Sequence, residues 1–121
     1  MLIALWILNA LLAVAFLGAG LLKITRPKPA LAAAGMGWTD DYTTGRIKAI
    51  GAAEVVGAVG LILPLATGIA PILTPIAATA LAIIMIGAVV THVRRKENAT
   101  PSLVLAVLSI ASAVLGFLVV A

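Results

Sequence analysis

The chemistry of this sequence centres on Glu54, which is the only acidic residue in any of the apolar segments of the chain. It lies within the stretch RIKAIGAAEVVGAVGLILP, which runs from Arg46 to Pro64. A charged side chain in hydrocarbon costs about 2.5 kcal/mol or more on insertion scales. Glu54 therefore needs a cationic partner, a proton or a water-lined cavity.

Three basic side chains are candidates to surround Glu54 in a polar cluster. Lys23 ends the first apolar run, Arg46 precedes Glu54 on the same segment, and His92 lies near the end of the third run. One interpretation is a buried ion pair that sets how neighbouring helices align, which adds little net stability. The other is a ligand pocket with a tunable proton, suited to a quinone, a lipid headgroup or a polar segment of a partner.

The composition places these residues in a membrane protein. Hydrophobic residues make up 64% of the 121 residues and charged residues only 10%, whereas soluble domains have about 25% charged residues. The chain has no cysteine, which excludes disulfides, thiolate metal sites and dithiol exchange within it. A single histidine does not make a metal site. We expect no metal, and a quinone is the candidate cofactor.

Four apolar runs, each near the roughly 20 residues that cross a bilayer, predict four transmembrane helices. The predicted spans cover residues 2–23, 44–63, 71–93 and 102–121. The fold class is therefore all-α, an integral membrane four-helix bundle with short loops, and residues 1–121 form a single domain. A cleaved signal peptide is the alternative for the first run. That run lacks a preceding basic region and ends in Lys23 rather than at an A-x-A site, which favours a helix.

Residues 24–45 form the longest polar stretch. Pro27 prevents the first helix from continuing, and residues 30–34 can form a short helix. Trp38 and Tyr42 are suited to a membrane interface, where aromatic rings sit at headgroup level. The stretch is either an ordinary connection or an interfacial or re-entrant segment that caps the bundle, and the aromatic residues favour the second.

Small and polar residues predict which helix faces pack against protein. Gly51 and Gly57 share a face with Glu54, and small residues let helices approach closely in membranes. Ser109 and Ser112 are the internal polar groups of the fourth span, where we expect helix–helix hydrogen bonds worth about 0.6 kcal/mol each.

The distribution of basic residues predicts the orientation of the chain. The net charge is +4, and the basic residues lie in the first and third connections while the second connection has none. By the positive-inside rule the first and third connections are cytoplasmic and both termini lie on the outer, periplasmic side. Topology accounts for the positive charge, so we expect the lipid bilayer, and not nucleic acid, as a partner.

Two segments resemble the DoxX-like family of small four-helix membrane proteins. FLGAGLLK, from Phe16 to Lys23, resembles the family's F-x-x-x-G-x-x-K signature. EVVGAVGL, which begins at Glu54, resembles the E-x-x-G-A-x-G-L part of its second-helix pattern. The resemblance covers nearly the whole chain. It implies that Lys23, Arg46, Glu54 and His92 match the family's recurring polar positions, and that the protein lies in a bacterial inner membrane.

The activities of the relatives are diverse. Some are subunits of thiosulfate:quinone oxidoreductase, others are linked to oxidative-stress systems, and distant animal relatives are assembly chaperones. The resemblance does not choose among these activities. The small size of the chain favours a non-enzymatic accessory or partner subunit of a larger membrane system, acting with a membrane protein or as a homo-oligomer. The alternative is a quinone- or lipid-binding subunit of a membrane redox system that uses Glu54 as a proton-coupled site. A transporter or channel would require an oligomer.

Overall fold

The computed structural model describes residues 1–120, which form five α-helices and one 3-10 helix and contain no strand. Four of the helices are long and apolar enough to cross a membrane. These are α1 (Leu2–Thr25), α3 (Thr44–Thr67), α4 (Leu73–Arg94) and α5 (Thr100–Val120). The first connection carries the short helix α2 (Lys28–Ala33) and the 3-10 helix η1 (Gly37–Asp41). The predicted all-α, four-span architecture is therefore confirmed.

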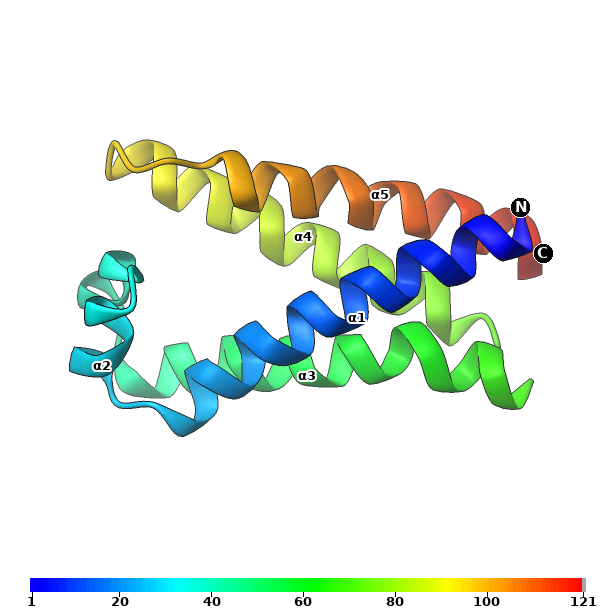
Figure 1. Ribbon diagram of the computed structural model, residues 1–121, viewed down its shortest axis with the longest axis horizontal. Coiled ribbons are helices and arrows are strands. Elements are labelled where there is room, and N and C mark those ends of the chain that lie inside the picture. The colour runs from blue at the N-terminus through cyan, green and yellow to red at the C-terminus, as the bar shows by residue number, and fades with distance from the viewer. Residues whose placement is uncertain (121) are drawn as a thin grey trace.

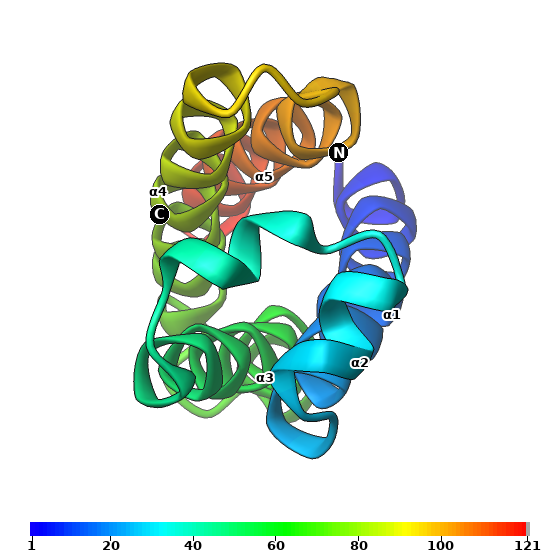
Figure 2. The same ribbon diagram turned by 90° about the vertical axis from the view of Figure 1, so that its left-hand side faces the viewer.

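The four long helices form two antiparallel pairs, α1 with α3 and α4 with α5 (Figure 1). The pairs lie close together at the end of the bundle where both termini are found, here called the terminal end. They diverge toward the opposite end, where α2 and η1 cross the bundle (Figure 2). We call residues 28–42 the lid, and this end the lid end.

The core between the pairs is apolar and tightly packed. Leu12 and Phe16 of α1 meet Leu61 of α3 and Leu81 of α4 in one cluster of buried side chains. A Cβ atom added to Gly57 would lie only 2.6 Å from a methyl carbon of Leu81. Glycine at this position lets α4 pack directly on the backbone of α3, so the small-residue face of α3 contacts protein.

Helix α3 differs from the sequence prediction at its end. The predicted span stopped at residue 63, before Pro64, but the helix continues through Pro64 to Thr67. Proline has no N–H, so the carbonyl of Gly60 loses its usual helical donor. The hydroxyl of Thr74, at the start of α4, donates to that carbonyl at 2.9 Å instead. A side chain from the next helix thus compensates for the proline, and Gly68, with φ of 71°, ends the helix.

Hydrogen bonds made by neutral polar side chains join three helices at the terminal end. Asn9 of α1 donates from its amide to the carbonyl of Leu61 at 2.9 Å, and the hydroxyl of Ser112 donates to the Asn9 side-chain oxygen at 2.5 Å. The hydrogen bond expected of Ser112 is therefore present. Ser109 is equally buried, but its hydroxyl has no partner among residues 1–120.

Candidate functional site

The crossing of α1 and α3 brings the two most buried charges of the site together. A Cβ added to Gly20 would lie 2.6 Å from the carbonyl oxygen of Gly51, so the two backbones are nearly in contact. Lys23 follows one turn after Gly20, and its Cβ lies directly beside Gly51. From there the lysine side chain reaches Glu54, one turn further along α3.

Lys23 and Glu54 form a buried ion pair. The Lys23 ammonium donates to Glu54 Oε1 at 2.5 Å. Glu54 is 1% exposed and Lys23 is 7% exposed. Neither charge would be tolerated alone in this buried position, because an uncompensated buried charge is strongly destabilising. Lys23 is thus the partner that Glu54 requires.

A cavity of about 500 Å³ lies beside this ion pair, between the diverging helix pairs. Lys23 and Glu54 lie on one wall and His92 on the other, and most of the remaining lining is apolar. The lining residues are Ala19, Lys23, Gly35, Met36, Trp38, Tyr42, Ile50, Glu54, Ile83, Ile84, Met85, Gly87, Ala88, Thr91, His92, Asn98, Pro101, Ser102 and Leu105. Ile83 is 65% exposed on α4, so the cavity extends to the apolar outer surface of the bundle.

The lid forms the end wall of this cavity. Trp38 and Tyr42 both line it, with their rings edge to face and their centroids 5.4 Å apart. The Lys23 ammonium lies 5.7 Å from the centre of the Trp38 ring, within the range of a cation–π contact. The lid therefore caps the bundle, as the second interpretation of residues 24–45 expects (Figure 2). Its depth in the membrane stays a prediction.

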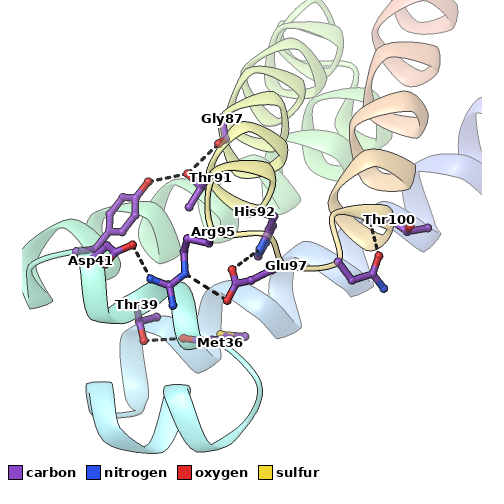
Figure 3. Close-up of polar contacts among 11 residues, drawn as sticks. Met36, Thr39, Asp41, Gly87, Thr91, His92, Arg95, Glu97 and Thr100 are labelled. Carbon is purple, nitrogen blue, oxygen red and sulfur yellow. Dashed lines mark hydrogen bonds and ion pairs between the residues drawn. The ribbon is translucent and has the colours of Figure 1, made fainter.

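The far side of the lid is fastened to the end of α4 (Figure 3). The Tyr42 hydroxyl is hydrogen-bonded to Thr91 at 3.0 Å. The Arg95 guanidinium donates to Asp41 Oδ2 at 2.5 Å. Within the lid, the Lys28 ammonium donates to the carbonyl of Tyr42 at 2.7 Å. The lid thus contacts both helix pairs, through Lys23 on one side and Arg95 on the other.

His92 contacts Glu97 rather than Glu54. The Nδ1 atom of its ring is 3.0 Å from Glu97 Oε1, and Glu97 Oε2 is 3.3 Å from Arg95 Nε. The hydrogen bond with His92, aided by Arg95, holds the pKa of Glu97 below its ordinary value. The hydrogen bond to Asp41, aided by the nearby Glu97 carboxylate, raises the pKa of Arg95. Glu97 and Arg95 are therefore both charged near neutral pH.

The structure brings three of the four predicted site residues, Lys23, Glu54 and His92, around one cavity. Arg46 does not line the cavity, and it lies exposed near the start of α3. Sequence reasoning did not assign Glu97 or Arg95 to the site. Both lie in the turn after α4, where no helical periodicity relates them to the cavity.

Residues 1–120 contain no group of three or more histidine, aspartate or glutamate side chains placed to hold a metal ion. The sequence profile of the DoxX-like family matches residues 7–115. No curated protein and no protein of known structure shows significant similarity to the chain.

Proposed function

Because the chain belongs to the DoxX-like family of membrane proteins, and because it contains a cavity with polar groups on two opposite walls, we propose that it is a ligand-binding subunit of a membrane redox system. The ligand is a quinone, held in the cavity beside Glu54. The chain is not an enzyme on its own in this proposal, because the electrons come from a partner membrane protein. The alternative to this proposal is that Glu54 stabilises the fold and binds no ligand.

The cavity is the observation that supports this proposal. Its volume of about 500 Å³ is within the range of small-molecule sites, which are about 300–1,000 Å³ and are lined mainly by apolar groups. A quinone combines an apolar ring and tail with two polar carbonyl groups. The apolar lining and the opening at Ile83 suit the tail, since a lipid-soluble ligand can enter from the bilayer.

The polar walls match the two carbonyl groups of a quinone ring. The Lys23 ammonium has three donors, and one of them is bonded to Glu54. It can donate another to a ligand oxygen, while His92 faces the cavity from the opposite wall. Reduction of a quinone requires protons, and the Lys23–Glu54 pair is placed to exchange a proton with the ligand oxygen. In this proposal Glu54 is the proton-coupled residue and Lys23 the ligand-orienting one.

Quinone content of the purified protein tests the proposal. Protein purified in mild detergent is extracted, and co-purifying molecules are identified by mass spectrometry in wild type and Glu54→Gln. We expect a quinone in wild type that is lost or strongly reduced in Glu54→Gln. Ser112→Ala is the matched control, because it removes a buried polar contact far from the cavity. Bulk phospholipid alone in all three proteins would contradict quinone binding.

A titration with decylubiquinone gives an independent measurement. Trp38 lines the cavity, and replacing the other tryptophan by Trp6→Phe leaves Trp38 as the single reporter. We expect decylubiquinone to quench Trp38 fluorescence saturably in wild type and only weakly in Glu54→Gln. Equal quenching in both proteins would show that Glu54 takes no part in binding.

The accessory-subunit function with a purely structural ion pair is the second candidate. The close approach of Gly20 and Gly51 favours it, because a charge pair at such a crossing sets the relative position of α1 and α3. This candidate predicts that a Lys23→Leu/Glu54→Leu variant keeps its stability and its partner binding. The quinone proposal predicts that the same variant folds but no longer retains the ligand.

The proposal includes an orientation in a bacterial inner membrane. The lid end carries the first and third connections with their basic residues, so we place it on the cytoplasmic side and both termini on the periplasmic side. Reaction of single cysteines with a membrane-impermeant thiol reagent in intact cells tests this orientation. We expect Ala33→Cys, in the lid, to be protected from the reagent. Met1→Cys, made in a chain with an added initiator methionine, should be labelled.

A further inference from the structure

Three contacts form a continuous chain from the lid to the cavity wall (Figure 3). Asp41 of the lid pairs with Arg95 at 2.5 Å, and Arg95 lies 3.3 Å from Glu97. Glu97 in turn lies 3.0 Å from the ring of His92, which faces the cavity. The proposed function uses only the last of these residues. The other three connect it to a segment that covers the ligand.

Glu97 determines which nitrogen of His92 is available to the cavity. A carboxylate only accepts hydrogen bonds, so the Nδ1 atom that contacts Glu97 carries the proton. The hydrogen bond made by one ring nitrogen sets the state of the other. Nε2 is therefore the nitrogen free for a contact in the cavity, and its direction follows the position of Glu97.

Arg95 links Glu97 to the lid. Its guanidinium is a planar fork, with Nη1 hydrogen-bonded to Asp41 and Nε in an ion-pair contact with Glu97 Oε2 at 3.3 Å. Movement of Asp41 away from the bundle therefore releases Arg95 and changes how Arg95 holds Glu97. Asp41 is 57% exposed in this pair, and exposed ion pairs contribute little to stability. The ion pair between Asp41 and Arg95 is thus weak enough to break and re-form.

We infer that Glu97 and Arg95 are positioning residues that couple docking of the lid to the orientation of His92 in the cavity. The coupling itself does not require a ligand, although its use rests on the proposed function. Coupling between sites is reciprocal. A ligand that holds His92 in place therefore favours the docked lid, and release of the lid weakens ligand binding.

Asp41→Asn is the variant that separates the lid from Arg95, and Asp40→Asn is its matched control. Asp40 is the neighbouring residue, it is exposed, and its carboxylate has no ion-pair partner among the described residues. Both variants remove one negative charge from the lid. Only Asp41→Asn should affect the chain of contacts to His92.

Lid docking is measured by the distance between two spin labels. The chain has no cysteine, so labels attach only at introduced sites. Ala33→Cys in the lid and Val93→Cys on α4 are exposed positions. In nanodiscs we expect a narrow distance distribution for this labelled protein and for its Asp40→Asn form. The Asp41→Asn and Arg95→Gln forms should give a broader distribution with a longer mean.

The coupling to His92 is measured without any ligand. The chain has one histidine, so its ¹⁵N ring signals in nuclear magnetic resonance spectra are unambiguous. We expect Asp41→Asn and Glu97→Gln to shift these signals and Asp40→Asn to leave them unchanged. Unchanged His92 signals in Asp41→Asn would overturn the inference, whether or not the lid distances change.

Decylubiquinone affinity then relates the coupling to the proposed function. Asp41→Asn should raise the dissociation constant obtained from Trp38 quenching by about fivefold or more, a usual size for coupling between sites. In a His92→Phe background Asp41→Asn should have no further effect, because the chain of contacts is already broken. Failure of every protein to bind decylubiquinone would refute the proposed function and leave the ligand-free test of the coupling valid.

Discussion

The terminal end and the lid end of this bundle use polar residues in opposite ways. At the terminal end, Asn9 and Ser112 are neutral, and they are bonded to each other and to the carbonyl of Leu61 inside a packed core. At the lid end, Lys23 and Glu54 are charged and lie beside a cavity. The same four helices therefore have a closed half and an open half.

The difference follows from what each kind of group needs when it is buried. A neutral amide or hydroxyl is satisfied by one or two hydrogen bonds, so helices can close tightly around it. A charge requires an opposite charge and further polar contacts, and it keeps unused donors or acceptors. The closed half therefore joins helices, and the open half retains the unused donors and acceptors on which the proposed function depends.

Breaking the ion pair should have the largest effect on this contrast. Lys23→Leu leaves Glu54 as an unpaired buried carboxylate, which should cost about 3–5 kcal/mol of stability. Thermal unfolding in detergent measures the loss. The Lys23→Leu/Glu54→Leu variant should recover most of it, because no unpaired charge remains. A Lys23→Leu protein as stable as wild type would mean that the pair does not hold the lid end.

Asn9→Leu should have an intermediate effect, confined to the terminal end. It removes the hydrogen bonds to Leu61 and Ser112, and such bonds in membrane proteins average about 0.6 kcal/mol each. We expect a loss of about 1 kcal/mol in the same unfolding measurement, with quenching of Trp38 by decylubiquinone unchanged. Loss of quenching in Asn9→Leu would show that the two ends do not act separately.

Acidification should have the smallest effect, limited to the lid. The pKa of Glu97 is lowered in the folded protein, mainly by its hydrogen bond with His92. Its contribution to lid docking is therefore complete above the ordinary value of 4.5 and is lost as the pH falls through the lowered pKa. The distribution of spin-label distances should be unchanged by Glu97 above the ordinary value of 4.5 and should broaden as the pH falls through the lowered pKa. Broadening that is equally strong in Glu97→Gln would assign the transition to another group.

The sequence was sufficient to predict the four-span architecture and to identify Glu54 as one member of a buried ion pair. The lengths of the apolar runs predicted four spans, and the isolation of Glu54 in such a run required a partner. The helix break expected at Pro64 was wrong, because Thr74 bonds to the freed carbonyl of Gly60. Nothing in the local sequence of α3 indicates that a residue of the next helix supplies this donor.

The sequence by itself determined that this chain is a bundle of four membrane-spanning helices with a buried carboxylate, because segment length and hydrophobicity are local properties. Only the tertiary structure decided that Lys23 and not Arg46 pairs with Glu54, since that choice depends on the crossing at Gly20 and Gly51. It also decided that the helix pairs diverge around a cavity and that Glu97 holds His92. Such contacts join residues on different elements, and their geometry depends on how the helices pack.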